Sequence, residues 1–237
     1  MITLAVFDMA GTTIDDGGAV YEALRRAVEE TGVSVSPADL QNWMGTEKRA
    51  AITALIELGG GDPSPAGTVD AAFERFRAIL DELYAETPPT PLPGIPAAIA
   101  ALRAAGTKVA LTTGFSVDVA EQILEGLGWV LSDPDDSAPN RAVRIDALVC
   151  GDEVASGRPA PYMIHRAMEL TGTPDVSEVL VAGDTLVDVQ AGARSGAAIT
   201  IGVLSGKLSR DAFAGQPYSA LLDSVAEVPD YLATSTA

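Results

Sequence analysis

The sequence predicts an α/β fold: a doubly wound, Rossmann-like parallel sheet with a helical domain inserted after its first strand. Two patterns lead to this prediction. Along most of the chain, short apolar runs alternate with helical patterns of about ten residues, as in sheets whose strands are joined by right-handed crossovers. Residues 17–93 break this alternation, because they show helical periodicity and no convincing strand.

Five apolar runs are the expected strands. The first covers residues 1–7 and stops at Asp8. It lacks clean alternation of apolar and polar residues, which is typical of a parallel strand that helices cover on both faces. The other strands are expected at 108–112, 147–150, 179–182 and 198–203, and the helices between them at 95–105, 117–127, 161–171 and 186–194.

The inserted segment is expected to be a small helical domain, because its apolar residues recur at helical spacing. They form three stripes: Val20, Leu24 and Val28; Ile52, Leu55 and Ile56; and Phe73, Phe76, Leu80, Leu83 and Tyr84. Ser36 before Pro37 predicts a helix start, with serine as the N-cap and proline as the first helical residue. Three glycines at 59–61 predict the end of a helix, and the proline-rich residues 87–93 predict an extended connector.

These boundaries divide the chain into two expected domains. The Rossmann-like core is placed at 1–16 and 92–237, and the helical domain at 17–91. Within the core, the polar residues 132–144 are expected to form a long exposed loop.

The composition excludes several classes of function. The chain has 237 residues with 33 acidic and 15 basic side chains, so its formal charge of −18 argues against binding nucleic acid or an anionic membrane. A single cysteine excludes an internal disulfide and a cysteine-built zinc site, and a single histidine disfavours a serine–histidine mechanism. The sequence has no run of about 18 apolar residues and no signal-peptide pattern at its start. We therefore expect a cytoplasmic protein, acting alone or as a homodimer, whose chemistry depends on carboxylates, backbone groups and a few cations.

Acidic residues follow the ends of several expected strands. In an open parallel sheet, ligands bind beyond the carboxyl ends of the strands. Asp8 and Asp184 stand at such ends, and Thr112 ends a third strand. Clustered carboxylates repel one another unless a cation neutralises them, and a site with only oxygen ligands favours Mg²⁺. For any single aspartate, capping of the next helix is an equal alternative.

The segment Asp8-Met-Ala-Gly-Thr-Thr13 is the most specific signal in the sequence. A carboxylate at the end of a strand, followed by a Gly-Thr-Thr turn, gathers backbone N–H groups around one point. Such a nest suits a phosphate or another oxyanion. An ordinary strand–turn with a glycine at positive φ is the alternative interpretation.

The chain resembles the haloacid dehalogenase superfamily. The first motif of that superfamily is a strand that ends in a nucleophilic aspartate, which is matched here by Asp8. The second motif matches Thr112, and the third, a cation before proline, matches Arg158. The fourth motif, an acidic pair after a strand, matches Asp184 and Asp188. All four motifs occur in family order, so the resemblance spans the chain and implies that the helical insert is a C1-type cap.

Within the superfamily, the chain is similar to the phosphonatase group. Most phosphatases of this type carry a second aspartate two residues after the nucleophile, and here that position is Ala10. The phosphonatase group uses arginine in the third motif, as at Arg158, and a cap lysine after a Met-Gly pair. Met44-Gly45-Thr-Glu-Lys48 has that spacing. The resemblance thus implies that Lys48 forms an imine with an aldehyde substrate, because an iminium accepts the electrons of a breaking carbon–phosphorus bond.

The resemblance also implies roles for the remaining residues. Mg²⁺ would be held by Asp8, the Ala10 carbonyl and Asp184, with Asp188 either as a further ligand or as a residue that orients Asp184. Asp8, Lys48, Thr112 and Arg158 would be the catalytic residues. The implied substrate contacts are Gly11, Thr12, Thr113, Gly114 and Met44.

Three departures from the phosphonatase pattern leave the substrate open. A cap histidine is replaced by Ala51, a tyrosine by Phe115 and a cysteine by Gly18. The expected function is hydrolysis of a small phosphonate such as phosphonoacetaldehyde. The alternatives are a phosphomonoesterase for a small organophosphate and a catalytically silent relative that binds a phosphorylated ligand.

Overall fold

The computed structural model describes residues 1–132 and 143–235. The chain forms two compact units, one of Met1–Asp15 with Thr90–Ala237 and the other of Asp16–Pro89. The first is called the sheet unit below and the second the helical unit. None of the helices in the described ranges is long and apolar enough to cross a membrane.

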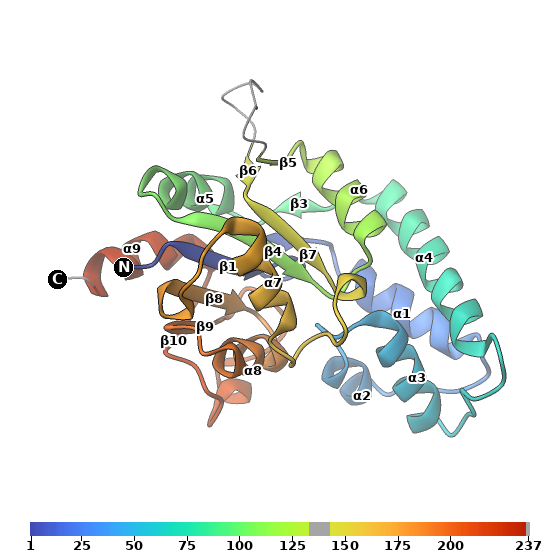
Figure 1. The fold of residues 1–237 in the computed structure, drawn as a ribbon. Coiled ribbons are helices and arrows are strands. Elements are labelled where there is room, and N and C mark those ends of the chain that lie inside the picture. Colours follow the sequence, from blue (N-terminus) through green and yellow to red (C-terminus); the bar gives the residue numbers. More distant parts are fainter. Residues whose placement is uncertain (133–142, 236–237) are drawn as a thin grey trace. The chain divides into compact units, whose positions relative to one another are not determined.

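The sheet unit is built on a parallel sheet, which confirms the predicted α/β fold (Figure 1). In the described residues its strand order is β10-β9-β8-β1-β4-β7. The bounds are β1 (Leu4–Asp8), β4 (Lys108–Thr113), β7 (Ala147–Cys150), β8 (Val179–Gly183), β9 (Ile199–Val203) and β10 (Ala220–Leu222). The five expected strands are therefore present to within a few residues, and the short edge strand β10 is additional.

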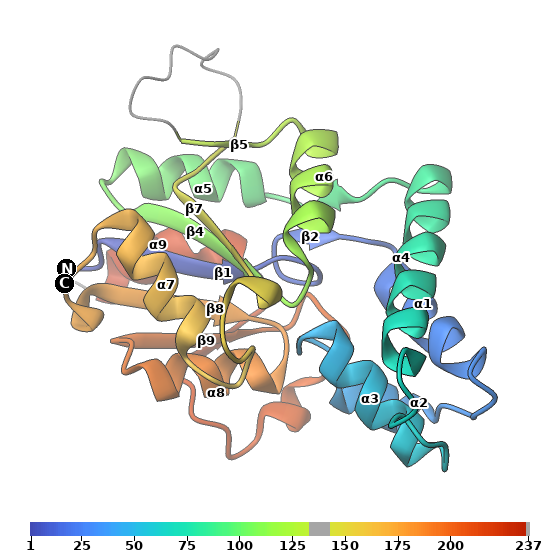
Figure 2. The same cartoon turned by 45° about the vertical axis from the view of Figure 1, so that its right-hand side comes forward.

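Helices cover both faces of this sheet. Helices α7 (Tyr162–Thr171) and α8 (Leu186–Ser195) contact each other on one face. Helices α5 (Ile95–Ala104) and α9 (Val228–Ser235) contact each other on the opposite face (Figure 2). Helix α6 (Val117–Leu127) has the predicted bounds. Short 3₁₀ turns lie at Gly151–Glu153, Val176–Glu178, Arg210–Phe213 and Val225–Glu227.

The core of the sheet unit explains why its strands read as continuous apolar runs. All five residues of β1 and all five of β8 are buried. Leu4, Val6 and Val181 pack in one cluster with Met163 and Ile164 of α7. Both faces of these central strands are thus covered by apolar side chains, as expected for a parallel sheet.

The helical unit contains α1 (Ala19–Glu29), α2 (Pro37–Asn42), α3 (Lys48–Leu58) and α4 (Thr68–Glu86). Helix α1 contacts α3 and α4, and α2 contacts α3. The predicted start of α2 is confirmed, because the Ser36 hydroxyl accepts a hydrogen bond from the Asp39 N–H and Pro37 is the first helical residue. The predicted end of α3 is also confirmed, with Gly59 as its C-cap.

Two short strands lie where the chain passes between the units. Strand β2 (Ile14–Asp15) pairs antiparallel with β3 (Thr90–Pro91). The connector at 87–93 therefore includes a paired strand, and the unit boundaries fall one or two residues from the expected ones. Strands β5 (Val130–Leu131) and β6 (Arg144–Ile145) flank the expected loop, whose residues 133–142 lie outside the described residues.

Candidate active site

The site residues that were predicted in the sheet unit lie together at the carboxyl ends of the central strands. Asp8 is the last residue of β1 and lies in register with Thr112 of β4. Strand β8 pairs with the other side of β1, and Asp184 follows its last residue. The strand order changes direction between β1 and β8, and this is where open α/β sheets bind their ligands.

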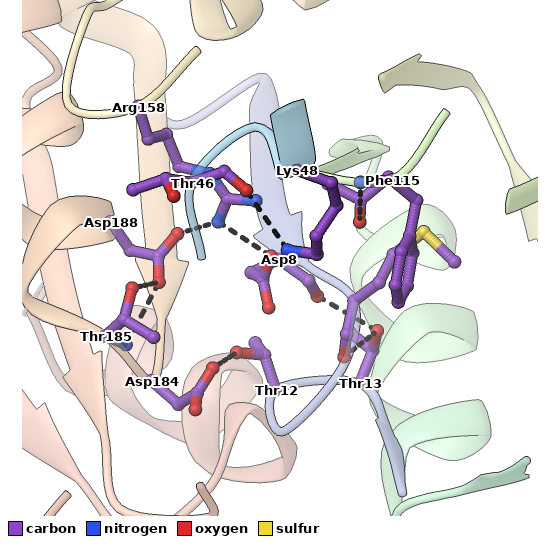
Figure 3. Close-up of polar contacts among 12 residues, drawn as sticks. Asp8, Thr12, Thr13, Thr46, Lys48, Phe115, Arg158, Asp184, Thr185 and Asp188 are labelled. Carbon is purple, nitrogen blue, oxygen red and sulfur yellow. Dashed lines mark hydrogen bonds and ion pairs between the residues drawn. The ribbon is translucent and has the colours of Figure 1, made fainter. Parts of the chain in front are cut away.

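Arg158 connects two of the aspartates. Its Nη1 atom lies 2.6 Å from Oδ1 of Asp8 and also forms an ion pair with Oδ1 of Asp188 (Figure 3). The side chains of all three residues are at most 8% exposed. A bare charge this deeply buried is very unfavourable, so the ion pairs are what allow these side chains to be charged here.

Asp188 is held by further donors. Its Oδ2 accepts hydrogen bonds from the N–H of Thr185, at 3.0 Å, and from the Thr185 hydroxyl. Thr185 is the N-cap of α8 and Asp188 its third residue, so the pair forms a capping box. Both oxygens of Asp188 are thus bound by protein groups, an arrangement that favours a role in orienting Arg158.

Asp184 is bound by the turn that follows β1. The Thr12 hydroxyl donates a 2.9 Å hydrogen bond to Oδ1 of Asp184, and both side chains are buried. The role of Thr12 as a substrate contact stays a prediction, and its hydroxyl is bound to the second carboxylate of the cluster. A link between residues so far apart in the chain has no signal in the local sequence.

The N–H groups of the Gly-Thr-Thr turn are hydrogen-bonded within the turn. The prediction that these groups form a phosphate-binding nest is therefore wrong. The N–H of Gly11 donates to the Ile14 carbonyl, and those of Thr12 and Thr13 donate to the Met9 carbonyl. The Thr13 hydroxyl donates to the carbonyls of Asp8, at 3.0 Å, and Met9, at 3.2 Å. The turn therefore uses these groups to fix the backbone around the first aspartate.

The residues that end β4 are buried beside Asp8. Thr112 and Thr113 are 4% and 3% exposed. The Thr113 hydroxyl accepts a 3.2 Å hydrogen bond from the N–H of Phe115, which closes the turn around Gly114. Thr113 thus shapes the turn, and Thr112 is the β4 residue in register with Asp8.

The charges of the cluster are unbalanced, and this shifts its pKa values. Burial raises the pKa of Asp8 to about 6; the Arg158 charge lowers it and the Asp188 charge raises it. Burial, together with the charges of Asp8 and Asp188, raises the pKa of Asp184 well above its usual range. Burial alone would lower the pKa of Arg158, but the charges of Asp188 and Asp8 raise it overall.

The cluster fits a small, hard cation. Among the described residues, Asp8, Asp184 and Asp188 offer carboxylate oxygens that all lie within 4.8 Å of one another. One arginine faces these three buried carboxylates, so a divalent cation would relieve their repulsion. The donors are all oxygen atoms, the ligands that Mg²⁺ prefers.

Arg158 also has donors directed at no protein group. Within the described ranges, its buried Nε and Nη2 atoms have no hydrogen-bond partner. Leaving such donors unpaired costs about 1–3 kcal/mol each, more for a charged group. A guanidinium with two unmatched nitrogens, which carry three N–H groups, beside a buried carboxylate suits the oxygens of a phosphoryl or phosphonyl group.

The helical unit carries the other two predicted residues, Lys48 and Met44. Lys48 is the first residue of α3, and its Nζ donates a 3.1 Å hydrogen bond to the carbonyl of Thr46 (Figure 3). Glu47, the N-cap, accepts hydrogen bonds from the N–H groups of Arg49 and Ala50, which fixes where the helix begins. Met44 is buried in the turn between α2 and α3.

Comparison with known proteins identifies the class. A family model described as haloacid dehalogenase-like hydrolase matches residues 2–196, and the chain belongs to this family of hydrolases. The chain is 30% identical over 217 residues to a phosphonoacetaldehyde hydrolase of Bacillus cereus, covering 86% of this chain and 76% of that protein. It is 28% identical over 226 residues to a phosphonoacetaldehyde hydrolase of Parabacteroides distasonis, covering 86% and 77%.

Solved structures share the fold. A hydrolase from Pseudomonas syringae superimposes with a TM-score of 0.81 at 21% identity, covering 98% of both chains. A phosphonoacetaldehyde hydrolase-like protein from Oleispira antarctica gives 0.79 at 22% identity, covering 98% of this chain and 92% of that one. At such identities the likeness concerns the fold alone.

Proposed function

We propose that this hydrolase cleaves the carbon–phosphorus bond of a small phosphonate, such as phosphonoacetaldehyde, with Mg²⁺ as cofactor. The main support is the buried guanidinium of Arg158, which pairs with Asp8 through one nitrogen and has two nitrogens without a partner in the described residues. A singly or doubly charged phosphonyl group would satisfy those donors and lie next to the Asp8 carboxylate. The relatives named phosphonoacetaldehyde hydrolase give the proposal its substrate class.

In this proposal Asp8 is the nucleophile. Against the effect of burial, the charge and hydrogen bond of Arg158 lower the pKa of Asp8, which favours the carboxylate form that can attack phosphorus. The C–P bond breaks as the Asp8 oxygen–phosphorus bond forms, which leaves an aspartyl phosphate. Water then hydrolyses this acyl phosphate, releasing phosphate and restoring the carboxylate.

The metal would be held by Asp8, Asp184 and the Ala10 carbonyl. Bound Mg²⁺ would neutralise charge on the phosphonyl oxygens and on the carboxylates. Asp188 is assigned to orienting Arg158, since both of its oxygens already accept protein hydrogen bonds or ion pairs. Thr112, in register with Asp8, is assigned to a phosphonyl oxygen.

Lys48 is proposed to stabilise the carbanion that leaves when the C–P bond breaks. A carbanion leaves far less readily than an alkoxide, so a general acid at position 10 would help little, and the residue there is Ala10. The Lys48 amine condenses with the substrate aldehyde and releases water. The electron pair of the C–P bond then enters the iminium to give an enamine, whose protonation and hydrolysis yield acetaldehyde and the free lysine. The proposal requires the Lys48 amine to reach the carbonyl carbon of the bound substrate.

Phosphorus NMR on a panel of small phosphonates and phosphate esters with Mg²⁺ tests the proposed reaction. The expected result is phosphate released from phosphonoacetaldehyde, with little release from simple esters. Release from esters alone would favour the phosphomonoesterase, which the departures at Ala51 and Phe115 keep as the second candidate. No turnover of any compound would favour a binding protein.

Borohydride trapping tests the imine. The chain has only three lysines, Lys48, Lys108 and Lys207, so the modified peptide is readily assigned by mass spectrometry. Borohydride with phosphonoacetaldehyde should inactivate the protein and label Lys48. Lys48→Arg keeps the charge but cannot form the imine, and should lose both labelling and C–P cleavage. Lys108→Arg is the matched control, and unchanged cleavage by Lys48→Arg would overturn the imine mechanism.

A further inference from the structure

The Asp184 carboxylate is enclosed by two loops that are distant in sequence. One is the turn after β1, which includes Gly11 and Thr12. The other follows β9 and includes Ser205 and Gly206. Each loop meets Asp184 at a specific atom, so the orientation of this side chain depends on both.

Thr12 fixes one oxygen of the carboxylate. Its hydroxyl donates to Oδ1 of Asp184 at 2.9 Å, and Thr12 is fully buried. The rotation of an aspartate carboxyl about its terminal bond is only weakly restricted by intrinsic preferences. A buried donor on one oxygen therefore selects the orientation in which the other oxygen, Oδ2, points away from Thr12.

Two glycines enclose Oδ2. A Cβ atom added to Gly11 would lie 2.6 Å from Oδ2, and one added to Gly206 would lie closer still. Gly11 has φ of 85°, so any side chain there would also strain the backbone. Gly206 has no such φ, and only lack of space excludes a side chain. Gly206 thus leaves room for the carboxylate in this orientation.

Ser205 joins the two loops. Its hydroxyl donates a 2.7 Å hydrogen bond to the Gly11 carbonyl. The loop after β9 is thereby tied to the same turn that provides Thr12. A displacement of either loop would shift the contacts on both oxygens of Asp184.

We infer that Thr12, Ser205 and Gly206 are positioning residues that hold Asp184 in the orientation needed to bind Mg²⁺. The inference rests on the proposed function, because it takes Asp184 as a metal ligand. Groups that orient a metal ligand commonly contribute about 10- to 100-fold in metal affinity. Loss of the Thr12 hydroxyl should therefore weaken Mg²⁺ binding while the fold is kept.

Titration of MgCl₂ into the metal-free full-length protein, followed by calorimetry, tests this inference. Thr12→Val keeps the shape of the side chain without the hydroxyl, and should bind Mg²⁺ about 10- to 100-fold more weakly than wild type. Thr12→Ser restores the donor and should recover most of the affinity. Circular dichroism should show the same secondary structure for both variants. In steady-state assays, Thr12→Val should need more Mg²⁺ for half-maximal rate and regain most of kcat at saturating Mg²⁺.

The loop after β9 is tested with a pair of glycine variants. Gly206→Ala should lower the Mg²⁺ affinity, because the new Cβ displaces Asp184. Gly126→Ala is the matched control, since a Cβ at Gly126 in α6 meets nothing within 4 Å, and it should bind Mg²⁺ like wild type. Ser205→Ala should weaken binding less than Gly206→Ala, because it removes only the tie between the loops.

The outcomes separate this inference from the proposed function. If wild type binds no Mg²⁺, or if Asp184→Asn binds it as well as wild type, the proposed metal site is wrong. The inferred positioning role is then overturned as well. If wild type binds, Asp184→Asn does not, and Thr12→Val and Gly206→Ala both keep full affinity, only the positioning role is overturned. Should Gly206→Ala fail to fold, the Thr12→Val and Thr12→Ser pair decides the question alone.

Discussion

Replacing Arg158 with methionine should destabilise the metal-free protein strongly and in a pH-dependent way. Both ion pairs of the cluster use the same Arg158 nitrogen, Nη1, on Asp8 and Asp188. Methionine keeps much of the buried side-chain volume but removes the charge. The two carboxylates would then face each other, and Asp184, without a buried cation.

The size of the effect follows from the contacts. Removing one partner of a buried ion pair costs about 3–5 kcal/mol, because a buried charge is left unpaired. The wild-type arginine also has two buried nitrogens without partners in the described residues, and losing these offsets part of the cost. We therefore expect the lower end, about 3 kcal/mol. For a chain of this size that corresponds to a fall in Tm of about 6–12 °C.

The sign of the pH dependence follows from the pKa of Asp8. Burial raises this pKa to about 6, and loss of the Arg158 charge would raise it further. A carboxyl whose pKa is raised by folding destabilises the folded state fully above the raised pKa, and this destabilisation fades as the pH falls from there towards the ordinary pKa of the carboxyl. The difference in Tm between Arg158→Met and wild type should thus be large at pH 7.5 and clearly smaller at pH 5.

Thermal unfolding in EDTA, followed by circular dichroism at both pH values, measures this. Arg166→Met is the matched control, because the Arg166–Glu169 pair has side chains 47% and 70% exposed. Exposed pairs contribute about 0–1 kcal/mol, so this control should unfold near the wild-type temperature. If Arg158→Met unfolds at the same temperature as Arg166→Met at pH 7.5, the account of the buried cluster is refuted.

Three further substitutions probe the carboxylate cluster and the start of α3. Asp184→Asn should raise the Tm of the metal-free protein at pH 7.5, because the raised pKa of Asp184 means that folding disfavours the charged carboxylate. The gain should vanish at low pH, where the carboxyl is protonated. Scanning calorimetry at the two pH values checks both expectations. Asp188→Asn should lower the free energy of unfolding, measured in urea, by at least about 1 kcal/mol, because it weakens both the capping box of α8 and an ion pair. An unchanged free energy of unfolding would contradict these two roles of Asp188. Glu47→Ala should cost about 1 kcal/mol through loss of the α3 N-cap, with the exposed Glu57→Ala as control.

Strands and helices with a strong local pattern were predictable from the sequence. The strand at 147–150 and the helix at 117–127 have the predicted bounds, because apolar content and turn residues mark both of their ends. Strand β10 was missed because its three residues are only half-buried at the edge of the sheet. The β2–β3 pair was missed because each strand has two residues and one of them is Pro91, a residue that usually argues against a strand.

Two kinds of signal predicted the residues of the cluster: Arg158 and Asp188 came from the resemblance to the family motifs, and the others stand at the ends of strands. Asp8, Thr112 and Asp184 were found because parallel strands end at one edge of the sheet. The sequence could not show that the N–H groups of the Gly-Thr-Thr turn are used within the turn, since that depends on its exact backbone conformation. The loop carrying Ser205 and Gly206 had no motif, and its contacts with the β1 turn and Asp184 are tertiary.

The antiparallel pairing of Asp15 with Thr90 has a practical consequence for protein engineering. The residues that precede and follow the 74-residue segment Asp16–Pro89 are neighbours on paired strands, so the two ends could be joined directly. A two-residue Asn-Gly turn is the usual way to close such a hairpin. A shortened chain, in which this turn replaces the helical unit, would keep every site residue of the sheet unit and would lack Lys48. It would offer a scaffold on which metal and phosphate affinity could be measured apart from imine chemistry.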